Sequence, residues 1–404
     1  MTFKYIELCA GAGGMRAGLD AAGWECILAV DKDPDAVAVH RLAHGSACKA
    51  DVTELAPNDL PVADAWVAGF PCQPFSSSGN RAGFGHHSGN VFEHLARLLQ
   101  QRKPPLVILE NVEGLLFNKS GHTFAAVLRS LTELGYEVDW LLMDLRWFGP
   151  PQTRPRLFIV AGLPNFLKTS ALADSSGLLP GFSQGEMNAF TPVLQAIDAV
   201  WEKRSEGLLS QTETSLRPLI GKARPVGPLP FGRLGHACGD RFVTYNLSGA
   251  HEPRPTPNLG VIVAPSFRGG QYIRSGRFYA RGGPTKLYLR DGPISHCVGT
   301  SLGGAPLFAV PVTAVARRAD RKAFLEHANW HREQGGSLVM RLRPDRAVLL
   351  FGPYTSELHE ALKQWEAGET RKYKLVGNLV APICAKTVAD LINAQISSEY
   401  AVAS

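Results

Sequence analysis

Short apolar runs that alternate with helix-like segments constrain the fold of the first 162 residues more than any other feature of the sequence. Five runs have the length and composition of buried strands: "KYIELCAG", "WECILAVD", "AWVAGFP", "PLVILEN" and "RLFIVAG". The segment "HTFAAVLRSLTELG" instead repeats apolar residues at the helical period and closes on a glycine. Strands that alternate with helices are typical of a parallel sheet covered on both faces. We therefore expect a doubly wound α/β domain.

The sequence changes character after about residue 163. Residues 215–310 are dense in Gly, Pro and Arg, which predicts short strands joined by long loops. The polar stretch "VARRADRKAFLEHANWHREQ", residues 315–334, favours a helix. The α/β pattern returns near the end, where a turn and a helix are expected over residues 381–396. Because 404 residues exceed one ordinary core, we expect two domains.

The net charge of +6 is unevenly distributed along the chain. Residues 163–340 hold 20 Lys and Arg against 12 Asp and Glu, or +8, and the remainder holds 22 against 24, or −2. The basic part is therefore the candidate for contact with a polyanion, although a solvated surface explains most such excesses.

Scattered cysteines and a moderate apolar content limit the class of protein. The seven cysteines form no Cys-x-x-Cys pair and no Cys/His cluster at metal spacing, so we expect neither a disulfide framework nor a metal site. No run approaches the roughly 18 apolar residues of a membrane helix, and the start lacks the order of a signal peptide. We expect a cytosolic protein without membrane contact.

A glycine cluster follows the first predicted strand, in "IELCAGAGGMRAGLDAAGW". Gly11, Gly13 and Gly14 let a ligand approach the backbone at the start of a helix. A dinucleotide fingerprint would require glycine where Arg16 stands, which disfavours a nicotinamide or flavin site. The cluster alone is a weak signal for a nucleoside ligand.

Two acidic residues strengthen the nucleoside interpretation. Asp31 ends the second strand 20 residues after Gly11, which is the spacing for binding ribose hydroxyls. Asp51 ends a third short strand, where its carboxylate can accept from an adenine amino group. The alternatives are a helix cap for Asp31 and a surface loop for Asp51.

Reactive side chains lie at the ends of later strands. Cys72 stands between two prolines in "GFPCQPFSSSG", directly after a strand, where parallel α/β proteins gather their active sites. Glu110 ends "PLVILE", and partial burial there would raise the pKa of its carboxyl and let it carry a proton. In "GPPQTRPR", Arg154 and Arg156 alternate and can project to one face, suited to a phosphate or the polar edge of a base.

The order of "LCAGAGG", "GFPCQPFSSSG", "ENV", "QTRPR" and "VGNLVAP" closely resembles the DNA (cytosine-5) methyltransferases, which use S-adenosylmethionine. The resemblance covers residues 3–162 and resumes at about 371–396. It implies a class I methyltransferase fold: a Rossmann-like, doubly wound mixed sheet with a smaller, loop-rich, mainly β target-recognition domain. We place the catalytic domain at residues 1–162 plus 371–404 and the target-recognition domain at residues 163–370.

The resemblance also implies a mechanism. Cys72 would add to carbon 6 of cytosine, because a soft thiolate suits conjugate addition and makes carbon 5 nucleophilic. Glu110 would hold and protonate ring nitrogen 3, while Arg154, together with Arg156, would orient the base and polarise its carbonyl oxygen. The implied cofactor contacts are Cys9, Ala10, Gly11, Gly13, Gly14, Asp31, Asp51, Val91 and Asn378.

Double-stranded DNA is the implied substrate, with the target base flipped out of the helix. The loop after Cys72 and the basic middle of the chain are the implied DNA contacts. The residues that we predict there are Gln73, Ser76, Ser78, Arg81, Arg268, Arg274, Arg277, Arg281 and Thr300.

Two alternatives stay open at this point: an RNA cytosine-5 methyltransferase, and a catalytically silent DNA-binding regulator of the same fold. Intact Cys72, Glu110 and Arg154 argue against a silent protein. We expect a monomer in the cytoplasm, associated with the nucleoid, and a restriction-modification system in which a cognate endonuclease acts separately.

Overall fold

The computed structural model describes the first and last parts of the chain almost continuously and the middle as separate strands. The described residues are 2–71, 91–115, 122–148, 150, 152, 154–164, 166, 232–238, 241–244, 274–279, 286–291, 297–300, 307–311, 328–334 and 337–403.

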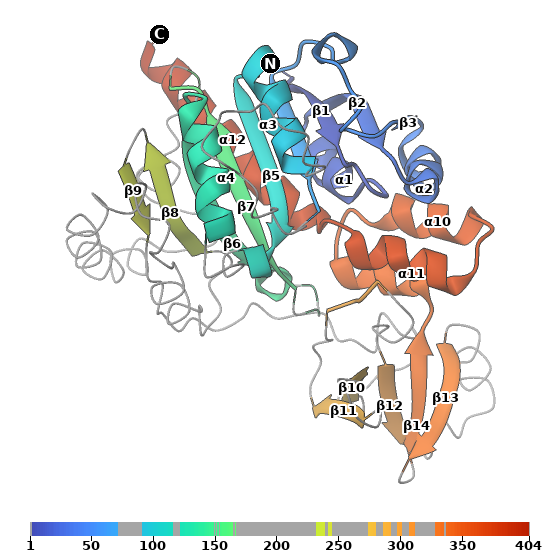
Figure 1. Cartoon of the computed structure of the whole chain (residues 1–404). Helices are drawn as coiled ribbons and strands as arrows, with labels where there is room; N and C mark the ends of the chain where they lie inside the picture. The colour runs from blue at the N-terminus through green and yellow to red at the C-terminus, as the bar shows by residue number, and fades with distance from the viewer. Residues whose placement is uncertain are drawn as a thin grey trace.

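A large mixed sheet forms the centre of the protein (Figure 1), with the strand order β3-β2-β1-β4-β5-β7-β6-β8-β9. Strands β1 to β5 run parallel, whereas β7 is antiparallel to both β5 and β6. This arrangement confirms the predicted α/β mixed sheet. The bounds are β1 Lys4–Leu8, β2 Glu25–Asp31, β3 Cys48–Lys49, β4 Ala65–Gly69, β5 Leu106–Val112, β6 Glu137–Asp144, β7 Pro155–Gly162, β8 Gly232–Cys238 and β9 Arg241–Thr244.

Helices cover both faces of this sheet, because consecutive strand residues point to opposite sides. Tyr5 belongs to one buried cluster, together with residues of α1 and α12, and Ile6 belongs to the other, together with residues of α3 and α4. In Figure 1, α3 and α4 lie in front of the sheet, and α1 and α12 lie behind it. The helix bounds are α1 Gly14–Ala21, α2 Pro34–His44, α3 Val91–Arg102, α4 His122–Glu133 and α12 Pro382–Ala403.

Two glycines of α1, which have no side chain, allow this helix to pack closely against the start of α12 and the residues just before it. A Cβ atom at Gly14 would lie 2.8 Å from Leu379 Cγ, and one at Gly18 would lie 2.9 Å from Ala385 Cβ. These glycines therefore bring the end of the chain against the first helix. The predicted helix over residues 381–396 is confirmed as the first part of α12.

A second, five-stranded antiparallel sheet lies apart from the first (Figure 1), with the order β11-β10-β12-β14-β13. The prediction of a helix over residues 315–334 is wrong at its end, because residues 328–334 form β13 and pair with β14. Strand pairing has overridden local helix preference there; residues 315–327 lie outside the described residues. The bounds are β10 Arg274–Tyr279, β11 Lys286–Asp291, β12 Leu307–Pro311, β13 Ala328–Gln334 and β14 Ser337–Leu342.

Some elements between residues 163 and 370 lie with the large sheet, although we assigned this range to the second domain. Strand β8 pairs with β6, and α10 packs against α2. Phe351 and Leu358 are buried in the same cluster as the β1 residue Tyr5, which explains why this segment joins the larger body. The two-domain division itself stays a prediction. The remaining bounds are α9 Pro344–Ala347, η8 Val348–Phe351, α10 Ser356–Gln364 and α11 Glu369–Asn378.

One stretch in the described part of the chain, Glu369–Ile396, is long and apolar enough to cross a membrane by length and composition. The structure buries 67% of its apolar window inside the protein. Burial of this kind is typical of a core helix.

Candidate active site

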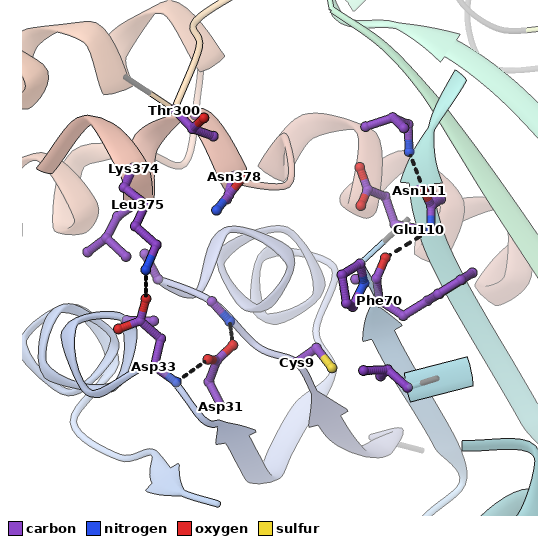
Figure 2. Close-up of a pocket in the computed structure, with 18 of the residues that line it drawn as sticks. Cys9, Asp31, Asp33, Phe70, Glu110, Asn111, Thr300, Lys374, Leu375 and Asn378 are labelled. Carbon is purple, nitrogen blue, oxygen red and sulfur yellow. Dashed lines mark hydrogen bonds and ion pairs between the residues drawn. The ribbon is translucent and has the colours of Figure 1, made fainter. Parts of the chain in front are cut away.

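A pocket of about 640 Å³ lies at the carboxyl ends of the parallel strands. Its walls come from the loop after β1, the ends of β2, β4 and β5, the segment 297–300 and helix α11 (Figure 2). The size is ordinary for a small-molecule site. The location is the sheet edge where open α/β proteins bind ligands.

The glycine loop between β1 and α1 forms the floor of this pocket. Cys9, Gly11 and Gly13 have positive φ angles of 55°, 56° and 94°, a conformation that favours glycine at the last two positions. The backbone N–H of Gly11 donates to Asp31 Oδ2 at 2.8 Å, and the N–H of Asp33 donates to Asp31 Oδ1 at 2.8 Å. Asp31 therefore ties the second strand to the glycine loop.

Six of the nine predicted cofactor residues line this pocket, and three do not. The lining residues are Cys9, Gly11, Asp31, Asp51, Val91 and Asn378. Ala10 is buried in a small apolar cluster with Val37. At Gly13 and Gly14 a side chain would meet protein instead of the pocket: His44 in one case and Leu379 in the other.

The surroundings shift the pKa values of Asp31 and Asp51, two of the acids that line the pocket, in opposite directions. Burial raises the pKa of Asp31, although the N–H groups of Asp33 and Gly11 oppose that effect. The N–H of Thr53 lowers the pKa of Asp51, which is also 3.6 Å from Lys32 Nζ. Asp51 is therefore the more readily ionised of the pair and remains an acceptor.

Glu110 lies on β5, next to Gly69 of β4 in the sheet register, and both residues line the pocket. Glu110 is only 8% exposed, and this burial raises the pKa of its carboxyl, an effect that Arg156 and Arg154 oppose. Arg156 Nε is 3.2 Å from Glu110 Oε1. Arg156 of β7 pairs with Val112 of β5 in the sheet register. Val112 is two residues from Glu110, so the side chains of Glu110 and Arg156 lie on the same face of the sheet.

The backbone between β4 and the predicted nucleophile is fixed by a neighbouring side chain. Asn111 Nδ2 donates to the carbonyl oxygen of Phe70 at 2.8 Å (Figure 2). Phe70 and Pro71 line the pocket and lead directly into Cys72. Sequence reasoning did not assign this role to Asn111. Cys72 itself lies outside the described residues, as do Gln73, Ser76, Ser78 and Arg81.

Arg154 differs from Arg156 in what its guanidinium contacts. Its Nη2 donates to the carbonyl oxygens of Gly377 at 2.8 Å and Leu379 at 2.7 Å. Its Nη1 is 3.2 Å from Cys297 Sγ, and the group lies 4.8 Å from the centre of the Phe351 ring. With 1% exposure, Arg154 joins three segments of the chain. Arg156 is the arginine paired with Glu110.

The segment 297–300 and helix α11 meet at the upper wall of the pocket. Gln152 Oε1 accepts from the N–H of Val298 at 3.0 Å, which fixes this segment against the large sheet. Thr300 and Asn378 both line the pocket (Figure 2). The structure describes only the backbone of Arg274 and Arg277, both in β10, and Arg268 and Arg281 lie outside the described residues.

The fold and the pocket define the class of the protein: an α/β chain with the Rossmann-like architecture of the class I methyltransferases. The family model for C-5 cytosine-specific DNA methylase matches residues 3–207, about half of the sequence. The chain therefore belongs to the C-5 cytosine-specific DNA methylase family, and the resemblance inferred from its motifs is confirmed.

Curated relatives agree with this family. The chain is 40% identical over 161 residues to the Type II methyltransferase M.BsuFI of Bacillus subtilis, covering 40% of this chain and 39% of that protein. It is 36% identical over 162 residues to M.MspI of Moraxella sp, covering 40% and 39%. The match thus spans about two fifths of these relatives. With M.NgoBI of Neisseria gonorrhoeae it is 37% identical over 226 residues, covering 56% of this chain and 67% of that protein.

Solved structures support the fold across the whole chain. The Dnmt2 methyltransferase of S. pombe superposes with a TM-score of 0.51 at 17% identity, covering 98% of this chain and 99% of that one. A DNMT2 mutant of Spodoptera frugiperda has a TM-score of 0.55 at 14% identity, covering 97% and 100%. At these identities the likeness concerns the fold alone.

Proposed function

We propose that the protein transfers the methyl group of S-adenosylmethionine to carbon 5 of a cytosine in double-stranded DNA, through a covalent adduct with Cys72. The observation that carries the proposal is the shared pocket. The Glu110–Arg156 pair and the Asp31–Gly11 contact both face it, beside the end of the strand that leads to Cys72. Acid, cation and nucleoside-binding groups therefore converge on one space.

The residues present fit a nucleoside cofactor. Among the described residues, and apart from the chain neighbours of Gly11, no atom lies within 4 Å of where a side chain at Gly11 would project, so a ligand has room beside the loop. Each carboxylate oxygen of Asp31 accepts one backbone N–H and has a further lone pair that can accept from a ribose hydroxyl. Asp51 would accept from the adenine amino group, while Val91 and Asn378 would complete the walls. When bound, S-adenosylmethionine supplies an electrophilic methyl group on its sulfonium.

The chemistry at cytosine follows from the remaining side chains. The Cys72 thiolate would form a bond to carbon 6, and the proton of Glu110 would go to ring nitrogen 3, which makes carbon 5 nucleophilic. After methylation, loss of the carbon 5 proton to a base, elimination of the Cys72 thiolate and return of the nitrogen 3 proton to Glu110 would restore the aromatic ring and the enzyme. We assign the contact with the carbonyl oxygen of the base to Arg156, since Nη2 of Arg154, which also lines the pocket, donates to two backbone carbonyls.

DNA recognition would use the middle of the chain. Its excess positive charge suits phosphate contacts, and a few side chains on its loops would read base edges in the major groove. Thr300, exposed beside the pocket, would contact a phosphate. The proposal includes base flipping, a monomeric cytoplasmic enzyme near the nucleoid and a separately acting restriction endonuclease.

Isotope transfer tests the proposed function. The protein would be incubated with methyl-labelled S-adenosylmethionine and duplex DNA, tRNA or no nucleic acid, and the labelled nucleoside would be identified. We expect label on carbon 5 of cytosine from the duplex only. Label only in tRNA would favour the RNA methyltransferase, and no label would favour the silent regulator.

Asp31→Ala should weaken cofactor binding by about 10-fold to 100-fold, because it removes the acceptor for ribose and for the Gly11 N–H together. Titration calorimetry with S-adenosylhomocysteine measures this change. Asp59→Ala, which removes a carboxylate in an exposed turn away from the pocket, is the matched control and should bind like the wild type. Equal affinities for the Asp31→Ala variant and the wild type would remove Asp31 from the cofactor site.

A further inference from the structure

Two histidines of α2 that do not line the pocket contact the glycine loop, and Arg16 of α1 contacts both histidines. His40 Nδ1 lies 3.3 Å from the carbonyl oxygen of Gly11, and His44 Nε2 lies 3.0 Å from the carbonyl oxygen of Gly13. A carbonyl oxygen only accepts, so each of these ring nitrogens carries the hydrogen. The two imidazoles therefore donate to two carbonyls of the same loop.

Arg16 contacts the ring of His40 and the backbone of His44. Its Nη1 lies 3.5 Å from His40 Nε2, which leaves that nitrogen without a hydrogen and matches a donor on Nδ1. The same guanidinium donates to the carbonyl oxygens of Ser46 at 2.9 Å and His44 at 3.3 Å. Burial, the neighbouring His44 and Arg16 lower the pKa of His40 to about 3. Both rings, 5.0 Å apart between centres, are therefore neutral donors.

The loop has a conformation that needs such support. Three of its residues, Cys9, Gly11 and Gly13, have positive φ angles, and Cys9 is not a glycine. The ring of His44 packs against the bare backbone of Gly13, where an added Cβ would lie 2.5 Å from His44 Cδ2. On its other side the loop is held by Asp31 through the N–H of Gly11. Gly11 is thus held at its N–H by Asp31 and at its carbonyl by His40.

We propose that His40 and His44, braced by Arg16, are positioning residues that hold the glycine loop in its cofactor-binding conformation. The inference rests on the proposed function, since it concerns the same cofactor site. It also assigns a structural role to Arg16, which stands where a dinucleotide fingerprint would have glycine: Arg16 supports the two histidines.

Paired substitutions distinguish the effect of losing the hydrogen bond from the effect of losing the volume of the ring. His44→Gln keeps an N–H near the position of Nε2, whereas His44→Met fills similar space without one. His40→Asn and His40→Leu form the corresponding pair for Nδ1. We expect the Met and Leu variants to raise the Kd for S-adenosylhomocysteine by about 3-fold to 10-fold, and the Gln and Asn variants to stay within about 2-fold. The kcat at saturating cofactor and the affinity for DNA should change by less than about 2-fold.

The outcomes distinguish this inference from the proposed function. A wild-type protein that binds no S-adenosylhomocysteine contradicts the proposed cofactor. Equal Kd values for His44→Met and His44→Gln, whether weak or unchanged, overturn the positioning role and leave the proposed function intact. Thermal melting checks folding, with Leu42→Gln on the exposed part of α2 as the control. If either apolar variant fails to fold, a Kd raised beyond about 3-fold in both His44→Gln and His40→Asn still overturns the inference.

Discussion

Glu110→Gln should lower kcat for methyl transfer by about 10²-fold to 10⁴-fold, because the amide can bind ring nitrogen 3 but cannot give it a proton. The carboxyl is nearly buried and is paired with Arg156. The Kd for S-adenosylhomocysteine should stay within about 2-fold, since the role we propose for Glu110 is on the base. Single-turnover kinetics with labelled cofactor measure the effect.

The pH dependence gives a second readout for the same residue. Burial raises the pKa of Glu110, so its carboxyl keeps the proton to higher pH than an ordinary glutamate. The wild-type rate should therefore fall as pH rises through this pKa, and the Gln variant should lack that alkaline fall. Glu133→Gln, on an exposed part of α4, is the control and should match the wild type. A Glu110→Gln variant with kcat within about 10-fold of the wild type would contradict the assigned role.

Arg154→Met should destabilise the protein by about 2–5 kcal/mol, because it leaves the buried carbonyl oxygens of Gly377 and Leu379 without their donor. Denaturant unfolding measures the loss, and the Tm should fall by roughly 2–6 °C. Arg41→Met is the matched control, since Arg41 is exposed and donates to a single carbonyl oxygen, that of Ala47. It should cost no more than about 0.5 kcal/mol.

Arg156→Met separates the roles of the two arginines. Its Tm should stay near that of the wild type, whereas kcat should fall by about 10²-fold to 10³-fold through loss of the cation beside the base. An Arg154→Met variant that melts with the wild type would show that its contacts with the α11–α12 junction contribute little to stability. Equal kcat losses with unchanged Tm in both variants would restore a shared catalytic role for the pair.

Most of the catalytic fold was predictable from the sequence, because the strands are continuous apolar runs and their ends carry distinctive residues. Glu110 and Asp31 were predicted at strand ends that the sheet does bring to one pocket. Strand β6 was not predicted, although "EVDWLLMD" has the apolar content of a buried strand. Its antiparallel place between β7 and β8 depends on pairing partners that local sequence does not specify.

The different contacts of Arg154 and Arg156, which both line the pocket, were beyond sequence reasoning. Both residues alternate along an extended segment, so a common face was the natural expectation. The difference comes from tertiary contacts, since residues about 220 positions later supply the carbonyls that Arg154 binds. The support of the glycine loop by His40 and His44 likewise depends on how α2 returns to α1. No spacing rule in the sequence predicts that contact.

The most direct test of the central claim is to trap the covalent bond between Cys72 and cytosine. The protein would be incubated with S-adenosylmethionine and random-sequence duplex DNA in which 5-fluorocytosine replaces cytosine. Fluorine at carbon 5 cannot leave as a proton does, so after methylation the enzyme should stay attached. We predict a denaturation-resistant complex, with the modified peptide mapping to Cys72 and no complex from Cys72→Ala. Methylation of ordinary duplex DNA without any trapped complex, or an equal complex from Cys72→Ala, would contradict the proposed mechanism.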